Sequence, residues 1–352
     1  MVLKGLTLPE LRQLLIDWGH PSYRADQVYS WMYQQLATSF AAMSNLPATL
    51  RARLEEETEL QVLSVGQREH SAATGTVKLL FSLQDGQAVE GVLMRYRKWY
   101  SACISSQAGC RMGCRFCAST LTGLARNLTQ AEMVDQVLAL EREAREAGGR
   151  VRSIVLMGTG EPLDNYGAVL GFLRLVTSPE SLDLSYRHIS LSTCGLVPGI
   201  RRLAREGLPL TLSVSLHAPT DELRSQLMPV NKLYPIRELL LACREYTERT
   251  GRRVTFEYAL IAGINDSLRE AHALAALLKG QLAHVNLIPL NEVAEREFKR
   301  PRPQQVTAFA LVLRKQGIPT TVRRELGADI SAACGQLRHR VFTRVSRRRG
   351  EL

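Results

Sequence analysis

The chain has 352 residues, of which 45% are hydrophobic and 22% charged, and this composition indicates a folded globular protein rather than a disordered one. No apolar run approaches the ~20 residues of a membrane span, and the N-terminus has no secretory pattern, so we expect a cytoplasmic protein without membrane contact. The net charge of +11 favours a polyanionic partner.

Residues 1–57 are predicted to form a small helical domain. Thr7 and Glu10 have the spacing of a capping box, which predicts a helix starting at Leu8. A second helix is expected near residues 23–36 and a third after Pro47. No catalytic side chain stands out here, so we expect this domain to dock or grip a substrate.

Residues 58–100 are predicted to form a β-hairpin extension. Hydrophobic residues alternate over 77–83, a turn follows at 84–87, and a returning strand covers 89–96. Glu90 shares a strand face with Val92 and Met94. A carboxylate among apolar neighbours is either at a sheet edge or a site group with a raised pKa, and both interpretations stay open.

Basic residues are concentrated in two segments. The run 95–100 (Arg-Tyr-Arg-Lys-Trp-Tyr) mixes cations with rings that could stack on bases, and residues 338–349 are strongly basic. The alternative is ordinary solubility charge with a disordered basic tail.

Residues 101–325 alternate between strands and helices. Six strands are expected, and the clearest helix covers residues 129–147, with Thr129 and Glu132 as its capping box. This pattern predicts an α/β fold with a partial (β/α)6 TIM-like barrel and a site at the C-terminal strand ends. A doubly wound sheet is the alternative. The expected strands are 101–107, 153–157, 188–192, 210–216, 254–260 and 284–290.

Three cysteines lie within eight residues, at Cys110, Cys114 and Cys117. Three thiolates can hold three irons of a four-iron, four-sulfur cluster and leave the fourth iron open for S-adenosylmethionine. The alternative is a zinc site with Cys103 as the fourth ligand. The odd total of seven cysteines argues for a reducing compartment rather than a disulfide framework.

Polar side chains recur where successive predicted strands end. Such groups could bind the ammonium, carboxylate, ribose or adenine of S-adenosylmethionine, and Glu161 suits the ammonium. Each alone is more typical of a turn or cap, so the argument depends on their recurrence. The segments are Gly158–Pro162, Ser192–Gly195, Ser213–Pro219 and Pro289–Asn291.

The isolated cysteines have different expected roles. Cys194 and Cys243 are expected to be buried structural thiols. Cys334 is followed by glycine in a polar segment within residues 326–352, which indicates a mobile loop where a thiol can react.

Together, Cys103–Cys117, Gly160–Pro162, Ser215–Pro219 and Asp329–Leu337 closely resemble the radical S-adenosylmethionine RNA methylases of the RlmN type, and the resemblance covers almost the whole chain. It implies methylation of carbon 2 of adenine in 23S ribosomal RNA near the peptidyl transferase centre. Transfer RNA, modified beside the anticodon, is a second implied substrate. An electron donor such as flavodoxin or ferredoxin is implied, and we expect a monomer.

The resemblance also implies residue roles. Cys110, Cys114 and Cys117 would hold the cluster, Cys334 would carry a methyl group, Cys103 would resolve the covalent intermediate, and Glu90 would accept the ring proton. Two molecules of S-adenosylmethionine would be used per turnover, one as methyl source and one as radical source. The residues implied to bind it are Gly160, Glu161, Ser192, Ser215, Leu216, His217 and Asn291.

Two alternatives remain at this level. A methylase acting on carbon 8 of the same adenine, of the antibiotic-resistance type, would share the sulfur chemistry. A zinc-stabilised, non-catalytic RNA-binding protein would have no need for Cys334.

Overall fold

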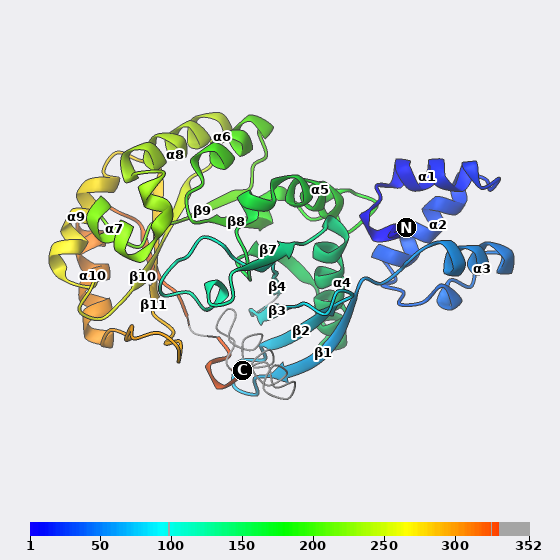
Figure 1. Ribbon diagram of the computed structural model, residues 1–352, viewed down its shortest axis with the longest axis horizontal. Helices are drawn as coiled ribbons and strands as arrows, with labels where there is room; N and C mark the ends of the chain where they lie inside the picture. Colours follow the sequence, from blue (N-terminus) through cyan, green and yellow to red (C-terminus); the bar gives the residue numbers. More distant parts are fainter. Residues whose placement is uncertain (98, 325, 331–352) are drawn as a thin grey trace.

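A computed structural model describes residues 1–97, 99–324 and 326–330 of the chain. Ten strands form one curved sheet in the order β1-β2-β3-β4-β7-β8-β9-β10-β11-β12, and β5 and β6 form a separate pair (Figure 1). The strands are β1 (Leu63–His70), β2 (Val77–Leu83), β3 (Ala88–Arg95), β4 (Tyr100–Cys103), β5 (Gln107–Gly109), β6 (Leu124–Asn127), β7 (Val151–Leu156), β8 (Ile189–Thr193), β9 (Thr211–Ser215), β10 (Val254–Leu260), β11 (Ala283–Pro289) and β12 (Thr320–Val322).

The predicted partial barrel is confirmed. Strands β4 and β7 to β11 run parallel to one another, while β3, β2 and β1 extend the same sheet from β4 in antiparallel order. The covering helices are α4 (Gln130–Glu146), α5 (Tyr166–Thr177), α6 (Val197–Glu206), α7 (Asp221–Leu227), α8 (Ile236–Thr250), α9 (Leu268–Leu278) and α10 (Pro303–Lys315).

Three details differ from the prediction. The single strand expected over 101–107 is interrupted after Cys103, because the chain leaves the large sheet and β5 pairs with β6 instead. An exposed edge strand, β1, pairs with β2, and a parallel strand, β12, extends the sheet beyond β11. Cys103 therefore lies at the end of β4 and not near the start of a longer strand.

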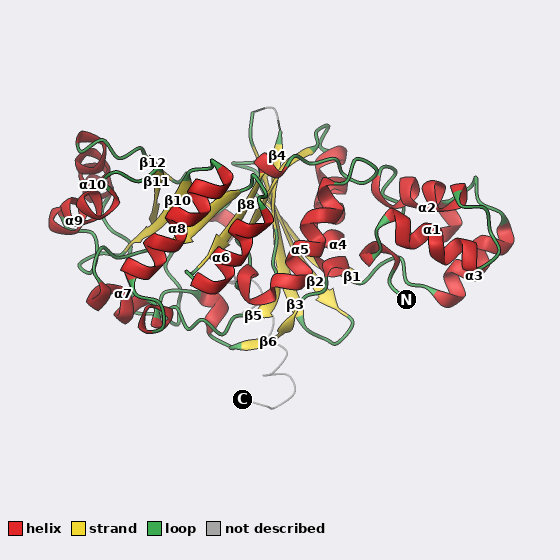
Figure 2. Cartoon of the chain, turned by 90° about the horizontal axis from the view of Figure 1, so that it is seen from above, coloured by secondary structure: helices red, strands yellow, loops and turns green. Residues whose placement is uncertain are grey.

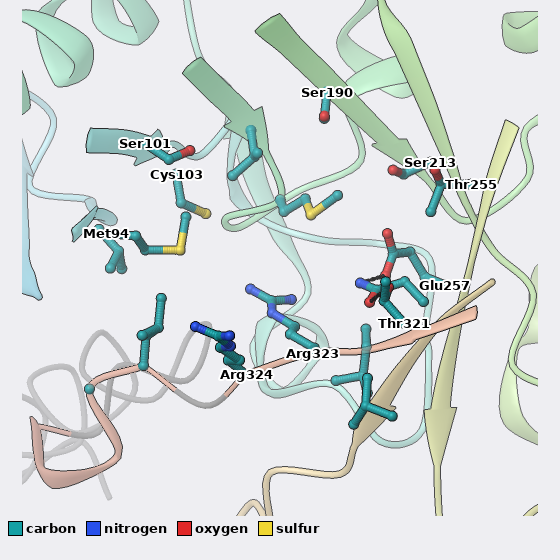
Figure 3. Close-up of a pocket in the computed structure, with 18 of the residues that line it drawn as sticks. Met94, Ser101, Cys103, Ser190, Ser213, Thr255, Glu257, Thr321, Arg323 and Arg324 are labelled. Atoms are coloured by element: carbon teal, nitrogen blue, oxygen red, sulfur yellow. Dashed lines mark hydrogen bonds between the residues drawn. The ribbon is translucent and has the colours of Figure 1, made fainter. Parts of the chain in front are cut away.

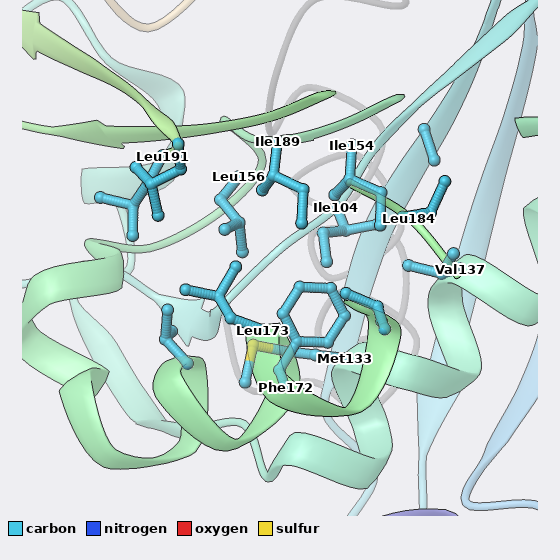
Figure 4. Packing of buried hydrophobic residues seen from close by; sticks show 14 of the residues in the cluster. Ile104, Met133, Val137, Ile154, Leu156, Phe172, Leu173, Leu184, Ile189 and Leu191 are labelled. Atoms are coloured by element: carbon cyan, nitrogen blue, oxygen red, sulfur yellow. The ribbon is translucent and has the colours of Figure 1, made fainter. Parts of the chain in front are cut away.

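Helix α4 shows why the sequence folds as it does. Glu132 accepts a hydrogen bond from the Thr129 N–H at 2.8 Å, and Thr129 Oγ1 accepts one from the Glu132 N–H at 3.2 Å, so the predicted capping box is confirmed. Its apolar stripe packs with α5 against β7 and β8 in the core shown in Figure 4. That stripe includes Met133 and Val137, both fully buried.

The N-terminal helices α1 (Leu8–Asp17), α2 (Tyr23–Tyr33) and α3 (Ala48–Glu57) form a lobe at one end of the molecule, next to α4 (Figure 2). A buried ion pair joins the lobe to the barrel: Lys4 Nζ lies 2.6 Å from Asp135 Oδ1. Asp135 Oδ2 also accepts a hydrogen bond from the Val62 N–H at 2.9 Å, which fixes the connection between lobe and sheet. No helix among the described residues has both the length and the apolar character of a membrane span.

Candidate active site

A cavity of about 1270 Å³ occupies the inner face of the curved sheet. Cys103 and Met94 line one wall, and Ser213 and Glu257 line the opposite wall (Figure 3). The guanidinium of Arg323 points into the space between them. Arginines outnumber carboxylates in the lining, which suits an anionic substrate.

Two of the three clustered cysteines, Cys110 and Cys114, are buried, and Cys117 is partly exposed. All three lie in the loop between β5 and β6. Thr120 Oγ1 donates hydrogen bonds to the carbonyls of Cys114 and Cys117, each at 3.0 Å, which holds the loop in shape. The three thiols therefore belong to one short loop that is held by its own hydrogen bonds.

Burial affects the protonation of these thiols. Burial, with the neighbouring Cys117 adding to it, raises the pKa of Cys110 to about 12. Burial likewise raises the pKa of Cys114 well above its ordinary value, with Cys117 and Cys110 contributing. Such thiols lose their protons when they coordinate a metal, and three cysteine thiolates are ligands that an iron–sulfur cluster takes.

The spacing of the ligands bears on which metal group fits. Among the described residues, no three His, Cys, Asp or Glu side chains are gathered closely enough to share one metal ion. A four-iron cluster needs no such sharing, because each cysteine binds a different iron. The three cysteines match the three protein ligands of a four-iron cluster with one open iron.

The turn after β7 is fitted closely to β5. Gly160 has φ +113°, and a Cβ on it would lie 2.6 Å from Gln107 Cβ, so a larger residue has no room. Glu161 donates its N–H to Gln107 Oε1 at 2.8 Å. Its own carboxylate accepts hydrogen bonds from the Leu163 N–H at 3.0 Å and the Cys194 N–H at 2.7 Å.

Glu161 therefore connects the ends of two neighbouring strands as well as facing the cysteine loop. Burial raises its pKa, although the two backbone hydrogen bonds oppose that shift. The carboxylate is thus prepared for a cation, and the ammonium of S-adenosylmethionine is a group of that kind.

His217 is held as a neutral ring. Its Nδ1 accepts a hydrogen bond from the Ala259 N–H at 2.8 Å, so the remaining proton is on Nε2. Burial, with Arg224 adding to it, lowers the pKa of His217 to about 3. The ring also meets Phe116, between two of the clustered cysteines, edge to face at 4.8 Å between centroids.

Arg224 is a central residue that the sequence analysis missed. Its guanidinium donates to the carbonyls of Leu216 at 3.1 Å, Cys194 at 2.7 Å and Ser215 at 3.1 Å, and to Asn231 Oδ1 at 2.8 Å. It thereby fixes two strand ends at which S-adenosylmethionine binding was predicted. A lone arginine in a short polar helix gives no sequence signal for this role.

Glu90 does not lie at a sheet edge, so that interpretation was wrong: β3 is paired on both sides, by β2 and β4. Its carboxylate forms a 2.9 Å ion pair with Lys78 on β2, and both side chains are at most 4% exposed. Val92, two residues further along the same face of β3, is paired with Cys103 and lines the cavity. Glu90 and Cys103 thus belong to adjacent strands of one wall.

The predicted binding residues divide into two groups. Asn291 lines the cavity together with Cys103. Ser192 and Ser215 each lie two residues beyond a cavity-lining serine, Ser190 or Ser213, and so continue the same strand faces toward the cysteine loop. Gly160, Glu161, Leu216 and His217 are at the strand ends, outside the cavity lining.

The sequence also predicted roles for the isolated cysteines Cys194, Cys243 and Cys334. Cys194 and Cys243 are buried, as predicted. Cys334, the expected methyl carrier, lies outside the described residues.

Comparisons with known proteins agree with this geometry. Residues 1–60 match the family model for the ribosomal RNA large subunit methyltransferase N-terminal domain, and residues 104–276 match that for the radical SAM superfamily. A solved structure, a radical SAM methyltransferase from Sphaerobacter thermophilus, superposes with a TM-score of 0.93 at 51% identity, covering 96% of this chain and 98% of that one.

Curated relatives are similar over almost their whole length. A protein of Symbiobacterium thermophilum is 56% identical over 96% of this chain and 91% of its own length. A protein of Pelotomaculum thermopropionicum is 55% identical over 96% and 92%, respectively. Both have the name "Probable dual-specificity RNA methyltransferase RlmN".

Proposed function

Because the chain belongs to the RlmN family of radical S-adenosylmethionine RNA methyltransferases, we propose that it methylates carbon 2 of adenine in RNA. The substrates are 23S ribosomal RNA, at the peptidyl transferase centre, and transfer RNA beside the anticodon. One observation carries the proposal: a single run of chain, β3 to β6, holds Glu90 and Cys103 on adjacent strands, with Cys103 lining the cavity, and the three clustered cysteines in the loop that follows.

The residues of the chain divide the work. Cys110, Cys114 and Cys117 hold the cluster, which when bound supplies the one-electron cleavage of S-adenosylmethionine. Glu161 receives the ammonium of that molecule, and the neutral His217 donates from Nε2. Ser192, Ser215, Leu216 and Asn291 complete its binding site, and Gly160 allows the backbone to approach it closely.

Sulfur and carboxylate groups act on the RNA. The Cys334 thiolate takes a methyl group from one S-adenosylmethionine by displacement and releases S-adenosylhomocysteine. The second S-adenosylmethionine would supply the radical that removes one hydrogen from the S-methyl group, which lets the methyl carbon bond to the ring. Glu90 then accepts the proton from carbon 2. Cys103 as thiolate then attacks the Cys334 sulfur, and the sulfur–carbon bond breaks. The released carbon takes up a proton to become the methyl group, and a disulfide remains between the two cysteines.

Cofactor and compartment follow from this sulfur chemistry. The disulfide must be reduced after each turnover and the cluster must receive an electron, so we place the enzyme in the reducing cytoplasm with a flavodoxin or ferredoxin as electron donor. We propose a monomer as the active unit.

The parts of the chain have distinct tasks in this proposal. Residues 1–57 grip the RNA, 58–100 form the β-hairpin extension with Glu90, 101–325 form the barrel, and 326–352 carry Cys334 and the basic tail. The helical lobe suits this task because a buried ion pair fixes it to the barrel.

Two cysteine variants test the assigned roles under anaerobic turnover with 23S rRNA fragments. Cys334→Ala should bind cluster and RNA and transfer no methyl group, and full activity in it would overturn the carrier role. Cys103→Ala should accumulate protein joined covalently to RNA, whereas Cys243→Ala, a matched buried cysteine, should not. Absence of the adduct would overturn the resolving role.

A further inference from the structure

The segment between β3 and β4 presents two stacked rings to solvent. Tyr96 and Trp99 lie with their ring centroids 4.3 Å apart and their planes 14° from parallel. The Tyr96 N–H donates to the Trp99 carbonyl at 2.9 Å, so a short backbone contact holds the pair together. Nevertheless, 41% of Tyr96 and 37% of Trp99 is exposed.

We infer that the Tyr96–Trp99 pair is a stacking platform for a nucleobase of the RNA substrate. Exposed, preorganised rings offer a flat apolar face with little further entropy to lose on binding. Arg95 and Arg97, both exposed, flank the platform and supply cations for the phosphates. Rings combined with basic side chains are the combination that recognises unpaired nucleic acid.

The position of the platform identifies which base it takes. Tyr96 and Trp99 line the same cavity as Cys103. Arg323 and Arg324, which follow β12 at the far edge of the sheet, line it too. A target adenine must leave its stack to reach the sulfur groups inside, and its neighbours then lose a stacking partner. The platform replaces that partner at the rim, so it holds a base next to the target.

This inference rests on the proposed function, because it takes the polyanion at the cavity to be RNA. It adds a substrate-positioning element that touches a base outside the reaction centre. The rings take no part in the methyl transfer itself.

Binding measurements separate stacking from charge. We would measure dissociation constants of the anaerobic holoenzyme for a 23S rRNA hairpin containing the target adenine and for heparin, a polyanion without bases. Tyr96→Ala/Trp99→Ala should weaken RNA binding about 5- to 150-fold and leave heparin binding unchanged. Tyr96→Phe/Trp99→Phe should retain RNA binding, and Arg95→Ala/Arg97→Ala should weaken both.

The intrinsic fluorescence of Trp99 gives a readout that needs no folded alanine variant. The RNA hairpin should quench native protein more than Trp99→Phe protein, because a stacked base quenches the indole. RNA binding without this difference would overturn the platform, as would equal weakening of RNA and heparin binding in the alanine variant.

Methylation measured on the same native sample keeps the two proposals apart. Methylated RNA without Trp99 quenching would contradict the platform and leave the methylase standing. Quenching without methylation would support the platform as an RNA contact and contradict the proposed function.

Discussion

Lys78 and Glu90 form an ion pair that is at most 4% exposed, on two neighbouring strands of the cavity wall. Burying two charges is costly, and removing one partner of such a pair costs about 3–5 kcal/mol. The pair thus keeps a carboxylate in an apolar wall, where the proposed proton transfer needs it.

We predict that Lys78→Met lowers the free energy of unfolding by about 3–5 kcal/mol. It should also slow methyl transfer more than it weakens RNA binding. Arg68→Met on the adjacent strand, which breaks the more exposed Arg68–Glu143 pair, should cost less than about 1 kcal/mol. Denaturant unfolding compares the two, and equal losses would contradict the assigned importance of the buried pair.

His217 gives a prediction about pH. Since its pKa is lowered to about 3, the ring should stay neutral from pH 5 to 8, and one histidine resonance in an NMR titration should not move over that range. Asparagine tolerates the left-handed backbone found at this position, where φ is +58°, so the variant His217→Asn assigns the resonance. The unfolded chain takes up this proton below about pH 6.5, so this group's contribution to stability is lost as the pH falls below that value.

At the scale of single residues, the sequence predicted a site best where the candidate ligands are close together along the chain. Cys110, Cys114 and Cys117 are such residues, because covalent spacing keeps them together in any fold. Arg224 was not predictable, since its partners Cys194 and Ser215 are joined to it only by folding. For Glu90, the sequence could not decide between an edge and a site, because strand order decides it.

The loop between β7 and α5 shows how an element constrains the site. Gly160 lies in this loop and has φ +113°. Gly148, in the turn between α4 and β7, also has a positive φ, +75°, but a Cβ there would meet nothing within 4 Å. Of these two glycines, only Gly160 would therefore bring an added side chain into contact with β5.

We predict that Gly148→Ala costs about 1–2 kcal/mol, from backbone strain alone. Gly160→Ala should cost about 1–3 kcal/mol more, because it also clashes with Gln107, and should weaken S-adenosylmethionine binding. Unfolding midpoints and ligand titration check both variants. Equal stability losses would show that the loop adapts and is not closely fitted.

Long amphipathic elements were predictable and short ones were not. Helix α4 has a capping box and a continuous apolar stripe, so both of its ends followed from the sequence. Strands β5, β6 and β12 have only three or four residues each, too few for a period to be recognised. Strand β1 is exposed along most of its length and lacks the apolar alternation that marks a half-buried strand.

At the scale of the whole molecule, the helical lobe and the barrel are joined through Asp135. One carboxylate oxygen contacts Lys4, near the N-terminus, and the other accepts a hydrogen bond from the Val62 N–H. Burial lowers the pKa of Lys4, while Asp135 opposes that shift. In the function proposed above, a rigid junction would keep an RNA bound to the lobe in a fixed position relative to the cavity.

We predict that Asp135→Asn costs about 3–5 kcal/mol and increases hydrogen exchange in residues 1–62. Asp26→Asn, which breaks the half-exposed Arg12–Asp26 pair within the lobe, should cost less than about 1 kcal/mol. Unchanged exchange at the junction in Asp135→Asn would contradict the anchoring role.

The overall architecture was predictable because strands and helices alternate over more than 200 residues, which permits few folds. The cavity was not, because its lining comes from segments as distant as 92 and 327. The sequence therefore indicated candidate residues along the chain, but not the shape of the space that they surround.

The central claim is that this chain methylates adenine at carbon 2. We would incubate anaerobically purified enzyme with reductant, methyl-labelled S-adenosylmethionine and a 23S rRNA fragment, then digest the RNA and identify the labelled nucleoside by mass spectrometry against standards. Label in 2-methyladenosine is the predicted result. Label in 8-methyladenosine, or in no nucleoside although the protein contains its cluster, would contradict the claim.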